Sequence, residues 1–266
     1  MTYDIVGNIA IIKFEDGRDA TRGKKLAEKK KVAKTIIERH KNISTVLEKI
    51  GQVSGRLRTI KTKHLAGTKT KEAEYRENGC TFKFNVEKCY FSPRLSEERK
   101  RLMQECKPEE KILVMFGGVA PYAIIIAKNK KEIKKIVSVE LGKECNKYAK
   151  INVKKNKVEG KVEIIPGDVK KVMPKLAKKK EYYQRIIMAR PNLQDSFIKY
   201  ALMVAKKDAV IHYHGFSHEE EKEKMVLELM KEIREEGREA EIISVIKVGD
   251  IAPRKYRWRI NIKIKN

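Results

Sequence analysis

The amino-acid sequence predicts an α/β protein in which a mainly parallel sheet of seven strands follows a small α+β domain. From Lys111 onward, short apolar segments alternate with amphipathic segments of helical period, which is the order that a parallel sheet requires. Before that point, strand patterns lie on either side of a single basic helical segment. We therefore expect a small domain over residues 1–88, a connecting turn and helix over residues 89–108, and the α/β domain over residues 109–266.

The small domain is expected to begin with a pair of strands over residues 4–14, because β-branched residues alternate there around a turn signal at Gly7. Residues 23–40 place apolar side chains at helical spacing and predict a basic helix. Residues 46–53 and residues 80–86 have the pattern of further strands. Together these elements predict the small α+β domain.

A turn at residues 91–94 precedes a helical segment over residues 95–106, for which Ser96 is the expected N-cap. The strands of the following domain are expected at residues 112–116, 136–140, 162–165, 185–189 and 209–213. Two more strands, at residues 241–247 and 256–264, are long enough to pair as a hairpin at the edge of the sheet.

Positive charge is the strongest feature of the composition. The chain has 62 Lys+Arg against 36 Asp+Glu, a formal net charge of +26 at pH 7. The excess is spread along the chain, with +11 on residues 1–105 and +15 on residues 106–266. A thermophile surface is the alternative explanation, but such surfaces are enriched in both signs, whereas this excess is one-sided. A polyanionic partner is therefore expected.

The composition also argues against several classes of protein. The four cysteines show no metal-ligand spacing, which favours reduced thiols and no metal site. No apolar run approaches the roughly 20 residues that span a bilayer, and the first residues lack the order of a signal peptide. We expect a cytoplasmic protein that binds neither metal nor membrane. The sequence has no readable signal for an oligomer, and a monomer is the expectation.

Groups that suit a nucleoside follow three consecutive strands of the α/β domain. The segment ILVMFGGVAPYAI runs from a strand through a glycine turn into a helix, which lets backbone amides approach a ligand, although such turns also serve tight packing alone. The next strand ends in Glu140, whose carboxylate can accept both hydroxyls of a ribose. The third is followed by Asp168, placed to meet an adenine amino group. Each carboxylate has helix capping as its alternative role.

Long motifs run through essentially the whole chain: YDIVGNIAIIKF, GRLRTIKTKHLAG, YRENGCTFKFNVEKCYFSPRLSEER, MFGGVAPYAI, PGDV, IIMARP, VIHYH and IAPR. In these motifs the sequence resembles the archaeal and eukaryotic tRNA (guanine-37-N1)-methyltransferases and their relatives, the wybutosine-pathway aminocarboxypropyltransferases. The resemblance implies a class I, Rossmann-like methyltransferase fold and S-adenosyl-L-methionine as cofactor. It also implies a tRNA-modifying transferase whose target base lies beside the anticodon.

Methylation of guanine N1 requires removal of the N1 proton and stabilisation of negative charge on O6. By resemblance, Glu98 in FSPRLSEER is the general base and Arg58 in GRLRT steadies the target base. The alternative for Glu98 is a solvent-facing helix carboxylate, and the alternative for Tyr90, which matches a position near the methionine end of the cofactor, is core packing. The expected cofactor-binding residues are Tyr90, Phe116, Gly117, Gly118, Val119, Pro121, Glu140, Asp168, Val169 and Pro191.

RNA contacts are expected on basic surfaces, because lysine and arginine bind phosphates without reading sequence. The candidates are Arg94, Lys61 and Lys63, within basic stretches at residues 24–39 and 61–71. The aromatic candidates for stacking on an unpaired base, His64, Tyr75 and Phe91, are not separable from ordinary packing. Some members of the family carry a further domain before this module, so a shorter grip on tRNA is expected here.

Three positions depart from the guanine methyltransferase pattern. Val114 replaces an acidic residue before the glycine turn, ELGK replaces a ribose-contacting DINP segment, and Ala189 replaces the asparagine of an NPP or NLP motif. The loss of that asparagine and the segment IHYH favour aminocarboxypropyl transfer, whereas FSPRL and Pro121 favour methyl transfer. Methylation of guanosine 37 is the first hypothesis, and aminocarboxypropyl transfer is the second. A non-catalytic tRNA-binding protein with a degenerate pocket is the third.

Overall fold

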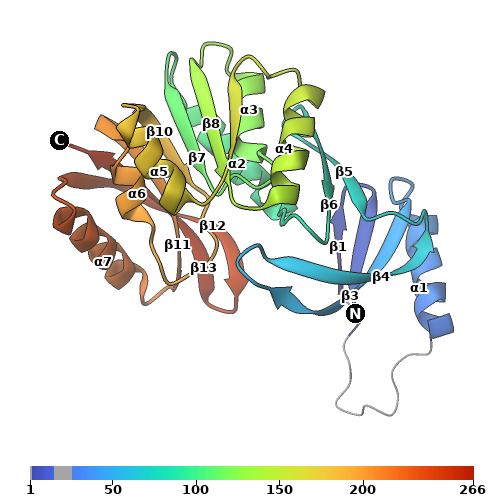
Figure 1. Ribbon diagram of the computed structural model, residues 1–266. Coiled ribbons are helices and arrows are strands. Elements are labelled where there is room, and N and C mark those ends of the chain that lie inside the picture. Colours follow the sequence, from blue (N-terminus) through green and yellow to red (C-terminus); the bar gives the residue numbers. More distant parts are fainter. Residues whose placement is uncertain (1, 15–25) are drawn as a thin grey trace. The chain divides into compact units, whose positions relative to one another are not determined.

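The structure, a computed structural model, describes residues 2–14 and 26–266. The chain forms two compact units (Figure 1). The smaller unit comprises Met1–Glu77 and Thr81–Pro93, and the larger comprises Asn78–Cys80 and Arg94–Asn266.

A four-stranded sheet and one helix form the first part of the smaller unit. β1 (Thr2–Val6) and β2 (Ile9–Lys13) form the predicted antiparallel pair. β3 (Thr45–Ser54) pairs in parallel with β2 and antiparallel with β4 (Thr59–Gly67). α1 (Leu26–Arg39) covers β3 and β4, in agreement with the predicted basic helix, whose first residues lie outside the described part. The apolar core between helix and sheet contains Ala10, Ile12, Ala33, Ile36, Ile43, Val46, Leu65 and Ala66.

The sequence pattern does not predict β4 or β5 (Glu72–Glu77). Both strands carry charged side chains at alternate positions, so each resembles a polar surface segment; Lys61 and Lys63 on β4 are exposed in this way. β5 and the predicted β6 (Cys80–Asn85) form a two-stranded sheet. The turn between them contains Asn78 and Gly79, both with positive φ, which is a strong hairpin signal.

The larger unit contains the predicted sheet of seven strands, in the order β12-β13-β11-β10-β7-β8-β9. Its parallel strands are β7 (Lys111–Met115), β8 (Lys135–Glu140), β9 (Val162–Pro166), β10 (Tyr183–Met188) and β11 (Ala205–His218). β12 (Ala240–Ala252) and β13 (Lys255–Ile264) form the predicted hairpin. β13 pairs antiparallel with β11, so of the two hairpin strands β12 lies at the edge of the sheet and β13 inside it, while β9 forms the opposite edge. The predicted α/β class and all seven predicted strands are confirmed.

Helices cover both faces of this sheet. Figure 1 shows α3 (Pro121–Asn129) and α4 (Lys143–Lys155) on one side, and α5 (Val169–Lys178), α6 (Ile198–Leu202) and α7 (Lys222–Glu235) on the other. The helices connect parallel strands, so the carboxyl ends of β7, β8, β9 and β10 meet at one edge of the sheet. A ligand site is expected at that edge.

The predicted N-cap at Ser96 is wrong by one residue. A 3-10 turn over Pro93–Leu95 runs directly into α2 (Ser96–Glu105), so helical geometry has already begun and Leu95 occupies the cap position without a side-chain hydrogen bond. Ser96 is instead an acceptor, because its carbonyl and its hydroxyl oxygen receive hydrogen bonds from the Asn78 amide at 3.1 and 3.4 Å.

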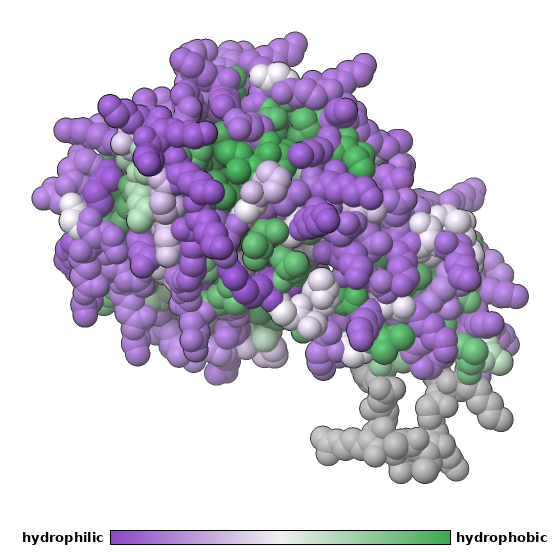
Figure 2. Space-filling model, viewed as in Figure 1, coloured by the Kyte–Doolittle hydropathy of each residue, from purple (hydrophilic) through white to green (hydrophobic). Residues whose placement is uncertain are grey.

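Hydrophilic side chains cover most of the face shown in Figure 2, with small and separate apolar areas between them. Within the described residues, no helix is long and apolar enough to cross a membrane. All four cysteines are buried.

Candidate functional site

The glycine turn after β7 has an unusual backbone. Phe116, Gly118 and Ala120 all have φ near +60°, and Pro121 follows as the first residue of α3. For the two residues with side chains, this conformation costs about 1–2 kcal/mol each. Gly117 is required for another reason, since a Cβ there would lie 2.1 Å from Oγ of Ser138 on β8. Val119 is fully buried, so its side chain also anchors the turn in the core.

Glu140 ties this turn to the end of β8. Its Oε2 accepts a hydrogen bond from the Gly118 amide at 2.8 Å, and its Oε1 accepts one from the Gly142 amide at 2.6 Å. Burial raises the pKa of this carboxyl above its usual value, against the lowering effect of hydrogen bonds from the Gly142, Gly118 and Leu141 amides. A carboxylate offers about four acceptor sites, so these three amides leave room to accept a ligand hydroxyl. The acceptor beside the glycine turn therefore fits the ribose of a nucleoside.

Asp168 lies at the end of the neighbouring strand, where it caps α5. Its side chain accepts a hydrogen bond from the Lys170 amide at 3.0 Å, so the capping role that the sequence allows is present. The preceding Gly167 donates its amide to the Glu140 carbonyl at 2.8 Å, which brings the two strand ends together. Val169, the first helical residue, is 3% exposed and packs in the core.

Arg190 holds the segment after β10 in place, and no sequence motif identifies it as a site residue. This buried guanidinium donates to the carbonyls of Leu193, Asp195 and His214. Its signal in the sequence is a lone arginine directly after an apolar strand, beside the departure at Ala189. Pro191 begins the segment that Arg190 holds and is half-buried.

Glu98 is buried within the larger unit. Only 3% of the residue is exposed, so the solvent-facing alternative for this helix carboxylate is wrong. Its Oε1 accepts hydrogen bonds from Nε2 of His214 at 3.2 Å and from Arg259 at 3.3 Å. Its Oε2 is buried and has no hydrogen-bond partner among the described residues. Neither His214 nor Arg259 was predicted, because each lies far from Glu98 in the sequence.

Arg58 and Tyr90 come together within the smaller unit. The guanidinium carbon of Arg58 lies 4.3 Å from the centre of the Tyr90 ring, which is cation–π geometry. Arg58 has φ +54°, and its Nε is buried without a partner in the described structure. Tyr90 is 40% exposed, so core packing does not explain it.

The predicted phosphate contacts are all exposed. Lys61 and Lys63 project from β4, and Arg94 lies in the 3-10 turn before α2. The aromatic candidates for base stacking are half-buried. The ring of Phe91 contacts Tyr75, Phe82 and Phe84, and Nε2 of His64 lies 3.1 Å from the Gly67 carbonyl oxygen.

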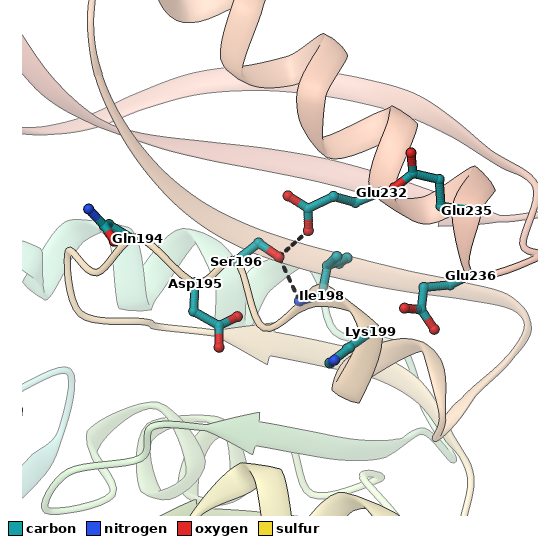
Figure 3. A pocket seen from close by; sticks show the side chains of 8 residues that line it. All are labelled: Gln194, Asp195, Ser196, Ile198, Lys199, Glu232, Glu235 and Glu236. Atoms are coloured by element: carbon teal, nitrogen blue, oxygen red, sulfur yellow. Dashed lines mark hydrogen bonds between the residues drawn. The ribbon is translucent and has the colours of Figure 1, made fainter.

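A pocket of about 270 Å³ lies between the segment before α6 and the last turn of α7 (Figure 3). In it the Ser196 hydroxyl donates to Glu232 and accepts a hydrogen bond from the Ile198 amide at 3.2 Å. Its lining residues are Gln194, Asp195, Ser196, Ile198, Lys199, Glu232, Glu235 and Glu236, which include none of the predicted site residues. Among the residues that the structure describes, no cluster of three or more potential ligands forms a metal site.

Known proteins resemble this chain over its whole length. The TRM5/TYW2 methyltransferase domain matches residues 73–243, and the TYW2 N-terminal domain matches residues 1–70. The chain is 36% identical to the tRNA (guanine(37)-N(1))/4-demethylwyosine(37)-methyltransferase Taw22 of Nanoarchaeum equitans, over 98% of this chain and 99% of that protein.

Solved structures show the same similarity. Trm5b from Pyrococcus abyssi matches with a TM-score of 0.83 and 31% identity, over 100% of this chain and 75% of that one. A complex of aTrm5 and tRNALeu matches with a TM-score of 0.83 and 28% identity, over 100% and 72% of the two chains. The chain therefore belongs to the TRM5/TYW2 family of S-adenosylmethionine-dependent methyltransferases.

Proposed function

We propose that this protein methylates N1 of guanosine 37 in tRNA, beside the anticodon. The similarity to Taw22, 36% identity over nearly the full length of both chains, supports methyl transfer at position 37. The related complex with tRNALeu and the net charge of +26 support tRNA as the substrate. A tRNA substrate also implies that the enzyme acts in the cytoplasm.

The observation that carries the proposal is the environment of Glu98. A carboxylate that acts as a general base needs one oxygen available for the proton, and Oε2 of Glu98 has no hydrogen-bond partner among the described residues. Because Oε2 is buried, the target guanine has to displace the side chains that cover it. Catalytic hydrogen bonds often reach their final geometry only when the substrate binds.

The chain's own residues have distinct tasks in this proposal. Glu140, which the Gly118 amide holds in place, positions the nucleoside part of the cofactor, and Asp168 lies at the adenine end. When bound, S-adenosylmethionine supplies an electrophilic methyl group on a sulfonium. Glu98 removes the N1 proton, and Arg58, steadied by Tyr90, offsets the negative charge that develops on O6.

Two observations support aminocarboxypropyl transfer as a second candidate. The TYW2 N-terminal domain matches residues 1–70, and Ala189 stands where the guanine methyltransferases have an asparagine. The same sulfonium carries both groups, so the reaction is decided by which of its carbons faces the substrate.

Isotope labelling separates the two reactions. A tRNA transcript with guanosine at position 37 is incubated with cofactor labelled on the methyl carbon or on the carboxyl carbon, and the digested nucleosides are separated by chromatography. We expect methyl label in 1-methylguanosine, and no label in a transcript with adenosine at position 37. Retention of the carboxyl label would establish the second candidate instead.

The role of Glu98 is tested by Glu98→Gln. This change removes the base while keeping the shape, so we expect single-turnover methyl transfer to slow by about 10²–10⁴-fold with nearly unchanged tRNA affinity. Glu97→Gln is the matched control, because Glu97 lies beside it on α2 with a side chain that is 64% exposed. A Glu98→Gln protein with the turnover of the wild type would remove Glu98 from the mechanism.

A further inference from the structure

Glu98 belongs to a buried polar cluster that joins α2 to β11 and β13. Oε1 of Glu98 is shared by His214 and Arg259, and the other end of the Arg259 guanidinium bonds to Glu105, two turns later on α2. Glu98, His214 and Arg259 are 3%, 0% and 1% exposed. Hydrogen bonds to ionised groups are stronger than neutral ones, and a low local dielectric strengthens them further.

The sheet fixes the positions of the two donors to Glu98, His214 and Arg259. His214 on β11 lies directly opposite Arg259 on β13 in the antiparallel ladder, and His212 lies opposite Asn261. Alternate residues of a strand point to the same face, so both pairs project from one side of the sheet. The backbone ladder, which is shared by two paired strands, therefore fixes the positions of the groups that hold Glu98.

His214 binds the carboxylate as a neutral ring. Burial lowers the pKa of His214 below its usual value of 6.5, against the raising effect of the hydrogen bond to Glu98. Because Nε2 faces Oε1, we assign the ring proton to Nε2, and Nδ1 then has no partner among the described residues. The donors thus occupy one oxygen of Glu98 and leave the other without a hydrogen bond.

We infer that His214 and Arg259 are positioning residues that hold Oε1 of Glu98 and reserve Oε2 as the oxygen that accepts the proton of the substrate. In the step, the N1–H bond breaks and its proton goes to Oε2. The electron pair on N1 forms the bond to the methyl carbon, and the pair of the breaking carbon–sulfur bond goes to sulfur. The inference rests on the proposed function, because it requires Glu98 to be the base.

The test compares His214→Leu, which removes the donor, with His214→Gln, which keeps an N–H group in a similar place. Single-turnover methyl transfer is measured between pH 5 and 9 with a tRNA transcript containing guanosine 37. We expect His214→Leu to slow the step by about ten- to hundred-fold, as for loss of a hydrogen bond to a charged group. The acidic limb of its rate–pH profile should move to higher pH, because a bond that favours the ionised carboxylate is lost. The KM for tRNA should stay unchanged, and His214→Gln should recover most of the rate.

His212→Leu is the matched control. His212 is also 0% exposed and lies two residues earlier on the same strand, but its ring nitrogens lie 2.6 Å from an Arg185 nitrogen and 2.7 Å from the Asn261 side-chain oxygen. We expect its removal to lower stability while leaving the rate–pH profile unchanged. If His212→Leu and His214→Leu slow the reaction equally with the same profile, the cluster is only structural and the inference is wrong.

Other titratable or charged groups around Glu98 do not obscure this comparison. Burial, with a smaller contribution from the charge of Glu98, raises the pKa of Tyr122, so its hydroxyl stays protonated at the assay pH. Arginine side chains stay charged in proteins, and the remaining carboxylate of the cluster is present in all variants. These groups are Arg99 and Glu105 on α2, Tyr122 on α3, and Arg257 and Arg259 on β13.

A double variant separates failure of the inference from failure of the proposed function. If Glu98→Gln alone leaves the rate unchanged, Glu98 is not the base and the proposed function loses its support. If Glu98→Gln is inactive but His214→Leu is fully active, only the positioning role is wrong. If both ideas hold, His214→Leu has little further effect on the residual rate of Glu98→Gln, because the two residues act through one group.

Discussion

At the scale of single residues, the basic side chains among the candidate residues have their positions set by specific partners. Arg259 is held between two carboxylates of α2, and Arg190 is held by three backbone carbonyls. Arg58 differs, because its guanidinium rests on the partly exposed ring of Tyr90. Its direction therefore depends on one aromatic contact, which a point mutation can test.

Tyr90→Ala should lower the methyl-transfer rate at saturating cofactor by about three- to thirty-fold, the value of one cation–π contact. Tyr90→Phe keeps the ring face and should retain most of the rate. Tyr182→Ala is the control, since Tyr182 is 39% exposed, close to the 40% of Tyr90, and makes no such contact with Arg58. A Tyr90→Ala protein that binds cofactor more weakly but has a normal saturated rate would assign the ring to the cofactor instead.

At the scale of elements, the glycine turn between β7 and α3 requires close packing on β8 and a strained backbone. Gly117 and Ser138 leave no room for a methyl group between them, and Phe116 and Ala120 adopt the left-handed conformation. Glu140 compensates by binding the Gly118 amide. Such strain persists only where surrounding contacts determine the backbone, and it is frequent at ligand sites.

Gly117→Ala should lower the free energy of unfolding by about 1–3 kcal/mol, because the new Cβ overlaps Oγ of Ser138. In a Ser138→Ala background, the nearest remaining side-chain atom is Cβ at 3.4 Å, and the cost of the same change should largely disappear. Gly160→Ala is the control, since nothing lies within 4 Å of its added Cβ. Urea denaturation measures the wild type and the four variants. Equal costs of Gly117→Ala in both backgrounds would show that the hydroxyl is not the obstacle.

At the scale of the whole molecule, charge is the dominant property. The net charge of +26 is shared by both parts of the chain, and exposed lysines on β4 belong to it. A polyanion bound through such side chains releases counterions, so its affinity depends steeply on salt. A small cofactor held at the strand ends lacks this dependence.

The proposed tRNA substrate should therefore bind at least about a hundred-fold more weakly at 200 mM than at 50 mM salt, while cofactor affinity changes little. Replacing Lys61 and Lys63 together by glutamate should reduce the slope of log affinity against log salt by about two. Replacing Lys224 and Lys231 on the glutamate-rich α7 is the control with the same change in charge. Filter binding measures the slopes, and equal slopes for both double variants would place the RNA contact elsewhere.

The sequence by itself determined the seven strands of the sheet, the glycine turn and the carboxylate at the end of β8. These features depend on local patterns: apolar periodicity marks buried strands and helices, and the carboxyl ends of parallel strands share one edge. The apolar pattern does not predict β4 and β5, because their exposed faces carry charged side chains.

Only the tertiary structure decided the surroundings of Glu98. The sequence places His214 and Arg259 far along the chain, and no local pattern links them to α2. The antiparallel register of β11 and β13 sets them side by side, and burial makes their bonds to Oε1 strong. The chemistry of Glu98 depends on which charged and polar groups are buried beside it, because the strength of a charge interaction is set by distance and dielectric.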